Sequence, residues 1–92
     1  MKFAVAQITI DNDTNLNMDK IRSYTSEAAR AKTDILCFPE CSLTGYRRDF
    51  HELNWDEILK GLDTLREIAT ESHLAIIVGT PYLESGKLYN AA

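Results

Sequence analysis

The spacing of apolar and polar residues changes along the chain and predicts alternating strands and helices. Residues 3–10 carry apolar side chains on both faces of a period-two pattern, which is typical of a strand covered on both sides. A polar break rich in helix-capping residues follows at 11–15. Over 16–31 the apolar residues recur at spacings of three and four, which predicts an amphipathic helix. The members of its expected buried stripe are Ile21, Tyr24, Ala28 and Ala31.

The next predicted elements are a short strand and a second helix, separated by an irregular segment at 41–53. The apolar run 35–38 is bounded by a proline and is too short for a helix, so we expect a central parallel strand there. Asn54 followed by Glu57 is a variant of the capping box and predicts a helix over 55–72. The members of its expected buried stripe are Ile58, Leu62, Leu65 and Ile68, with Leu59 and Ala69 beside them.

Strands make up the last part of the predicted fold. Residues 74–78 are a third buried strand, and a turn at 84–86 joins the segment before it to an antiparallel strand over 87–92. The order β-α-β-loop-α-β-β indicates an α/β layered sheet. Because the apolar pattern stops within a strand, we interpret 1–92 as one truncated N-terminal part of a domain.

Composition and charge narrow the possible classes of protein. The chain of 92 residues is 45% hydrophobic and 26% charged, which is typical of a globular domain. A net charge of −4 argues against binding to nucleic acid phosphates. The apolar runs, of about five residues, are far shorter than the roughly 20 that cross a membrane. Because the first residues also lack a secretory-signal pattern, we expect a cytoplasmic protein that binds neither nucleic acid nor membrane.

Glu40 is the most informative candidate for chemistry. It follows a buried strand and Pro39, so we expect it at the carboxyl end of that strand, where open α/β sheets bind ligands. Pro39 fixes its own φ and lacks an amide donor, which ends the strand and directs the next side chain. A carboxylate in this place can act as a general base. Position alone leaves a second interpretation open, a capping or surface glutamate.

Other polar and aromatic residues near this position are weaker candidates. A zinc site on Cys37, Cys41 and His51 would lack a second ligand pair, so we expect no metal site. We also expect no Cys41–His51 nucleophilic dyad, because a buried free cysteine usually behaves as a small hydrophobic residue. Gly45 is expected in a turn with positive φ. Tyr46 either packs near the Glu40 turn or contacts substrate, and it is our candidate for substrate binding.

The two arginines that follow are also ambiguous, because Arg47 and Arg48 could bind a substrate carboxylate or lie in a solvated loop. His73 ends the second predicted helix. We expect it to meet the last carbonyl groups of that helix rather than a substrate.

A motif around Glu40 and segments on either side of it together resemble one known family. Segment 34–46 reads Asp-Ile-Leu-Cys-Phe-Pro-Glu-Cys-Ser-Leu-Thr-Gly-Tyr and resembles the glutamate motif of the nitrilase superfamily, the carbon–nitrogen hydrolases. Residues 2–7 resemble that family's first strand, and 75–80 followed by 86–92 resemble its third strand and the hairpin after it. The resemblance implies the N-terminal part of a nitrilase-like α-β-β-α sandwich.

The resemblance also implies a covalent mechanism that uses a Glu, a Lys and a Cys. In the family the Glu is the general base, the Cys attacks the amide or nitrile carbon, and the Lys stabilises the tetrahedral intermediate. Glu40 matches the family's Glu. Neither Cys37 nor Cys41 matches its nucleophile, and neither Lys60 nor Lys87 matches its Lys. We therefore expect the 92-residue chain to be inactive alone.

Substrate class and assembly follow from the same resemblance. Family members hydrolyse non-peptide C–N bonds of small amides, N-carbamoyl compounds or nitriles, use no organic cofactor or metal, and commonly form homo-oligomers. For this chain we expect exposed strand edges, one uncovered apolar sheet face and self-association. Two alternatives stay open: a non-catalytic binding or regulatory module of the same fold, and a small flavodoxin-like or response-regulator-like domain. The final strand pair argues against the second.

Overall fold

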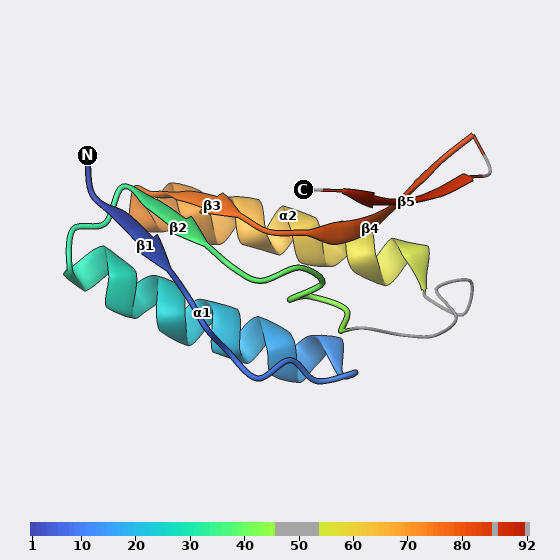
Figure 1. Cartoon of the computed structure of the whole chain (residues 1–92), viewed down its shortest axis with the longest axis horizontal. Coiled ribbons are helices and arrows are strands. Elements are labelled where there is room, and N and C mark those ends of the chain that lie inside the picture. The colour runs from blue at the N-terminus through green and yellow to red at the C-terminus, as the bar shows by residue number, and fades with distance from the viewer. Residues whose placement is uncertain (46–53, 86, 92) are drawn as a thin grey trace.

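The computed structural model describes residues 1–45, 54–85 and 87–91, with 82–84 and 88–91 described by their backbone alone. In these residues a parallel sheet is followed by an antiparallel hairpin, and the helices connect the strands of the sheet (Figure 1). The elements in chain order are β1 (Phe3–Val5), α1 (Thr14–Arg30), β2 (Ile35–Cys37), α2 (Trp55–Ser72), β3 (Ala75–Ile77), β4 (Thr80–Glu84) and β5 (Lys87–Ala91).

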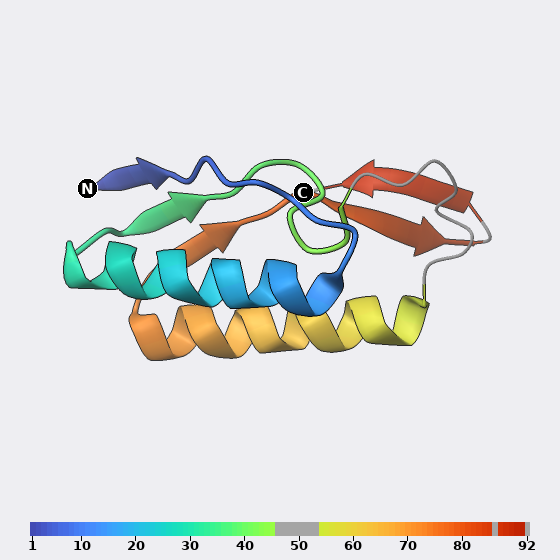
Figure 2. The ribbon, with the colours of Figure 1, turned by 90° about the horizontal axis from the view of Figure 1, so that it is seen from below.

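The central strand of the sheet is β2. The strand order is β1-β2-β3, and β2 is parallel to both neighbours. Parallel neighbours need long crossover connections, which α1 and α2 provide. Both helices lie on the same side of the sheet, as Figure 2 shows. The α/β order predicted from the sequence is therefore confirmed, as is the antiparallel pairing of β4 with β5.

The helix-covered face of the sheet forms the hydrophobic core. Leu36 in β2 and Phe38 just after it are 2% and 3% exposed. They pack with residues from α1, α2 and the strand ends. The buried members of this cluster are Ala6, Ile21, Ala28, Leu36, Phe38, Leu65, Ile68 and Leu74.

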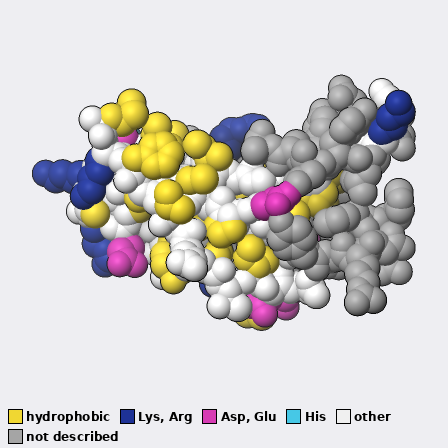
Figure 3. All heavy atoms as spheres, in the orientation of Figure 1, with side chains coloured by type: hydrophobic (Ala, Val, Ile, Leu, Met, Phe, Trp, Pro, Cys, Tyr) yellow, Lys and Arg dark blue, Asp and Glu magenta, His cyan; other side chains and the backbone are white. Residues whose placement is uncertain are grey.

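The opposite face of the sheet is also apolar, but the described part of the chain places no layer over it. Val5 is 74% exposed and Ile77 is 42% exposed. The register aligns them across the sheet, with Cys37 of β2 between them. Phe3, one row away, is 57% exposed. Figure 3 shows hydrophobic side chains gathered over these strands, so the expected uncovered apolar face is present.

Local capping explains where the helices begin. Asn54 accepts a hydrogen bond from the Glu57 amide at 3.2 Å, and α2 begins at Trp55 and ends at Ser72, as predicted. The start of α1 lies at Thr14 rather than 16, because Asp13 caps it and accepts the Asn15 amide at 2.9 Å. None of the helices in the described ranges is long and apolar enough to span a membrane.

The strands are shorter than predicted because β2 limits the pairing. The prediction of a strand over 3–10 is wrong beyond its first residues: β1 ends at Val5, although the Ala6 amide still donates to the Cys37 carbonyl oxygen at 2.9 Å. Since β2 itself ends at Cys37, the residues after Ala6 have no strand beside them to continue the ladder.

The buried stripes also differ from the predicted ones in part. On α1, Tyr24 is 40% exposed and Ala31 is an exposed C-cap, so both were wrongly placed in the core. On α2, Leu59 is 44% exposed, and Gly61 enters the buried face instead. Two polar side chains complete the stripe on the first helix, where hydrophobic periodicity cannot detect them. The buried residues of α1 are Asn17, Ile21, Thr25 and Ala28.

Candidate functional site

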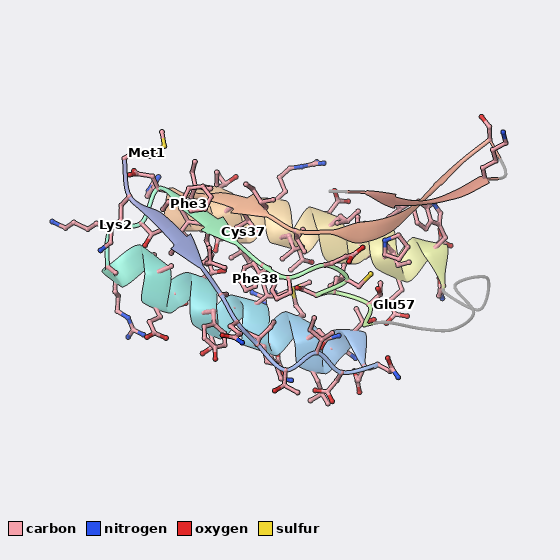
Figure 4. The ribbon with its side chains drawn as sticks, in the orientation of Figure 1. Met1, Lys2, Phe3, Cys37, Phe38 and Glu57 are labelled. Carbon is pink, nitrogen blue, oxygen red and sulfur yellow. The ribbon has the colours of Figure 1, made fainter. Side chains whose placement is uncertain are left out.

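Glu40 begins the turn that leaves the carboxyl end of β2. Cys37 and Phe38, both labelled in Figure 4, mark the end of this strand. The turn is tied to the chain between β3 and β4, because the Cys41 amide donates to the Gly79 carbonyl oxygen at 3.0 Å. A Cβ atom on Gly79 would lie 3.0 Å from the Glu40 Cα, so a glycine there allows the two backbones to approach. Glu40 therefore lies where β2 and β3 end.

The side chains of Glu40 and Cys41 differ in their surroundings. The Glu40 side chain is exposed in the described structure, whereas Cys41 is buried. Burial raises the pKa of the Cys41 thiol above its ordinary value, the negative charge of Glu40 raises it further, and a hydrogen bond with Thr44 lowers it. A thiol held in its neutral form and out of solvent is a poor nucleophile. This supports the sequence-based exclusion of Cys41 as the attacking group.

The turn after β2 is packed closely against the helical layer. Leu43 is fully buried, and a Cβ atom on Gly61 of α2 would lie 2.8 Å from the Leu43 Cδ2 atom. The Gly45 amide donates to the Cys41 carbonyl oxygen at 2.8 Å, which closes the turn. Gly45 has φ +77°, as predicted, and a Cβ atom there would overlap the Asp11 carbonyl oxygen. The turn therefore has little freedom to move.

A buried amide on α1 joins this turn to the chain after β1. Asn17 donates from Nδ2 to the carbonyl oxygens of Asp11 at 2.7 Å and Leu43 at 3.0 Å. Its Oδ1 accepts the Asp11 amide at 2.9 Å. Lys20 adds an ion pair to Asp11, with 2.7 Å between Nζ and Oδ2. Asn17 was not among the residues predicted from the sequence, and the available signal was its position four residues before the buried Ile21.

Several predicted candidates are not brought into the site by the described structure. Cys37 is half-buried in β2, and both cysteines are free thiols. His73 is the C-cap of α2 with φ 55°, and its backbone N–H bonds to the Ala69 and Thr70 carbonyl oxygens, as expected for a residue that ends the helix. No group of three or more His, Cys, Asp or Glu in the described ranges could hold a metal ion. The candidates outside the described residues are Tyr46, Arg47, Arg48 and His51.

Comparison with known proteins identifies the family. A family model described as carbon-nitrogen hydrolase matches residues 2–92. The chain belongs to the carbon–nitrogen hydrolase family. The resemblance seen in the Glu40 motif is therefore confirmed over almost the whole sequence, and the flavodoxin-like alternative is excluded.

Relatives of the carbon–nitrogen hydrolase chain include a curated protein and solved structures. Omega-amidase NIT2 of Mus musculus is 30% identical over an aligned length of 92 residues, and the alignment covers 97% of this chain and 33% of the relative. An amidase from Nesterenkonia sp. superposes with a TM-score of 0.83 at 24% identity, over 91% of this chain and 33% of that one. A Glu-to-Gln, Cys-to-Ala double mutant of the Nesterenkonia sp. AN1 amidase, in complex with acrylamide, also superposes with a TM-score of 0.83. Its sequence is 23% identical, and the match covers 91% of this chain and 33% of that one.

These likenesses confirm the predicted fold class, since the sheet and helices superpose on nitrilase-like amidases. The chain spans about a third of the length of the curated relative that it matches.

Proposed function

We propose that Glu40 is the general base of a carbon–nitrogen hydrolase that cleaves amide bonds of small molecules. The observation that carries this proposal is the placement of Glu40 at the carboxyl ends of β2 and β3, in a turn whose backbone is tied to Gly79. Membership of the carbon–nitrogen hydrolase family supports the reaction class. The names of its amidase relatives support amides over nitriles.

In the proposed reaction the Glu40 carboxylate takes the proton of a cysteine thiol as its sulfur attacks the amide carbon. The amide oxygen gains negative charge in the tetrahedral intermediate, and a lysine ammonium stabilises it. The protonated carboxyl then gives its proton to the departing nitrogen, so ammonia or an amine leaves and a thioester remains. Glu40 next deprotonates a water molecule, which hydrolyses the thioester to a carboxylic acid and frees the thiol.

The nucleophilic cysteine and the lysine are proposed to lie outside residues 1–92. Cys37 is part of β2, and the raised pKa of the buried Cys41 thiol disfavours its thiolate. The chain spans about a third of its curated relative, so the rest of such a domain would complete the surface that faces Glu40. The rest of such a domain would also cover the apolar sheet face.

The decisive experiment uses the protein encoded by the complete open reading frame that contains residues 1–92. We expect ammonia release from simple amides such as acrylamide, and a loss of about 10²–10⁴-fold in kcat in Glu40→Gln. Glu57→Gln is the matched control, because Glu57 is an exposed carboxylate at the start of α2 (Figure 4) and should leave the rate unchanged. Unchanged turnover in Glu40→Gln would overturn the proposal.

The 92-residue chain alone supplies a second test. We expect no ammonia release from it with amides or nitriles, because a base without its nucleophile cannot form the thioester. Robust turnover that disappears in Glu40→Gln would show that the nucleophile lies within these residues. A complete reading frame without a suitable Lys and Cys would instead favour the alternative of a non-catalytic binding or regulatory module.

A further inference from the structure

Asn17 has the features of a residue selected for its hydrogen bonds rather than for packing. Its side chain is 0% exposed on the buried face of α1. The Oδ1 atom accepts the Asp11 amide, and the Nδ2 atom donates to two carbonyl oxygens, of Asp11 and Leu43. These partners fix the orientation of the side chain, because a backbone N–H can only donate and a carbonyl oxygen can only accept.

The hydrogen bonds of Asn17 join two segments that the sheet does not join. Asp11 belongs to the chain between β1 and α1, and Leu43 belongs to the turn that Glu40 begins. Gly45 packs against the same Asp11 carbonyl group from the other end of the turn. The turn is thus fastened to the helical layer through Asn17 and Asp11, and to the sheet through the Gly79 carbonyl oxygen.

We infer that Asn17 is a positioning residue for Glu40. The side-chain amide of Asn17 holds the turn after β2 in the geometry that presents the Glu40 carboxylate. This inference rests on the proposed role of Glu40 as the base. Replacement of Asn17 by an apolar residue would keep the burial but leave the Asp11 amide and the Leu43 carbonyl oxygen without this partner. The turn would then lose its attachment to α1 while the sheet kept its own hydrogen bonds.

The unmodified 92-residue chain gives the first test by NMR. We expect the side-chain NH2 protons of Asn17 to exchange with solvent at least about tenfold more slowly than those of Asn15, an exposed asparagine on the same helix. Equal exchange rates would overturn the inference without any substitution, so the test does not depend on a variant that folds.

Substitutions give the second test. In Asn17→Ala we expect exchange of the Cys41 and Gly45 amides to rise at least about tenfold relative to the amides of β2. Ile21→Val is the control for general destabilisation, since Ile21 is equally buried on α1 but bonds to neither segment. Asn15→Ala controls for the loss of an asparagine from this helix. If Ile21→Val and Asn17→Ala raise turn exchange equally at matched global stability, the positioning role is wrong.

Catalysis separates this inference from the proposed function. In the protein from the complete reading frame, we expect Asn17→Asp to lower kcat at least about tenfold with little change in KM, because the carboxylate cannot donate to Leu43. Ile21→Val should leave kcat unchanged. If Glu40→Gln abolishes turnover but Asn17→Asp does not alter kcat, the positioning role fails and the proposed function stands. If Glu40→Gln has no effect, the proposed function fails, whereas the exchange experiments still decide whether Asn17 fixes the turn.

Discussion

The two faces of the parallel sheet are both apolar, yet only one is covered by the described part of the chain. On the helix side, Leu36 is 2% exposed; on the other side, Val5 and Ile77 are 74% and 42% exposed. Strands with apolar residues on both faces are typical of sheets with a layer on each side. The exposed apolar face therefore indicates a sequence suited to a sheet with a second layer, in agreement with a chain that spans about a third of its curated relative.

The candidate site likewise has a part that is packed against the helical layer and a part that is exposed to solvent. The turn that carries Glu40 is fixed from the covered side, by Leu43 packed on Gly61 and by the amide of Asn17. The Glu40 side chain itself is exposed. The described residues therefore provide the support of the proposed base, and its side chain is left open to solvent.

The largest effect is expected where the covered side fixes the turn. Gly45→Ala should lower the free energy of unfolding by about 3–5 kcal/mol, because the residue has φ +77° and its Cβ atom would overlap the Asp11 carbonyl oxygen. Urea unfolding measures the loss. Gly61→Ala is the comparison: its Cβ atom would lie 2.8 Å from the Leu43 Cδ2 atom, so the side chain of Leu43 must shift, but the residue is helical and alanine favours the helix, so we expect a smaller loss. Equal losses in both variants would contradict the rigid support proposed for the turn.

A matched pair of truncations compares the two faces directly. Leu36→Ala should cost about 2–4 kcal/mol, because it opens a cavity in the covered core. Ile77→Ala should cost less than about 1 kcal/mol, since that side chain already contacts solvent. Both values come from urea unfolding of the 92-residue chain at a concentration at which sedimentation finds only monomer, so that association through the open face does not contribute. Comparable losses would mean that the open face is covered in solution.

The elements that local chemistry determines were predicted well from the sequence. The capping pair Asn54 and Glu57 predicted the start of α2, His73 was correctly predicted to end it, and the positive φ of Gly45 followed from residue type. The position of Glu40 at a strand end followed from the apolar run and Pro39. Each of these depends on residues close together in the chain, so the sequence alone contains the information.

Features that depend on tertiary pairing were not predictable in the same way. The length of β1 is limited by its partner β2, which no pattern within residues 3–10 reveals. Asn17 and Thr25 occupy buried positions on α1 although both are polar, because position on the helix decides their burial. The approach of Gly79 to the Glu40 backbone requires β2 and β3 to be neighbours first.

Self-association tests whether the open face binds a partner. We predict that the 92-residue chain associates through this face, and that Ile77→Lys weakens association at least about tenfold by placing a charge on it. Sedimentation velocity over a range of concentrations measures the effect. Leu59→Lys is a close control, since Leu59 is 44% exposed on α2 and Ile77 is 42% exposed on β3. Disruption by Leu59→Lys alone would assign the contact to the helices instead.

A stabilising substitution tests whether a buried hydroxyl on the covered side lacks a hydrogen-bond partner. Among the described residues, the Thr25 Oγ1 atom is buried with no hydrogen-bond partner. Thr25→Val keeps the shape of the side chain and removes this hydroxyl, so it should raise the free energy of unfolding by about 1 kcal/mol. Thr70→Val is the control, because the exposed Thr70 hydroxyl donates to the Arg66 carbonyl oxygen at 2.9 Å. A loss of stability in Thr25→Val would show that the hydroxyl has a partner in solution.

The smallest effect on stability is expected from the interaction between the buried Cys41 thiol and the exposed Glu40 carboxylate. The pKa of Cys41 is raised by burial first and by Glu40 second. From about pH 8.5 upwards the unfolded chain releases this proton before the folded chain does, so the free energy of unfolding falls until the folded pKa is passed.

Glu40→Gln removes the negative charge beside the thiol, so the pKa of Cys41 should fall. The loss of stability at alkaline pH should then become smaller, but burial of the thiol should keep part of it. Urea unfolding between about pH 7 and 10 measures this loss, and the ¹³Cβ shift of labelled Cys41 follows its ionisation. Adding Cys41→Ala should abolish the difference between the unsubstituted chain and Glu40→Gln, which separates the thiol from the other groups that titrate in this range. An unchanged pKa in Glu40→Gln would place the carboxylate farther from the turn than the structure does, and would weaken the case for a base held rigidly from the covered side.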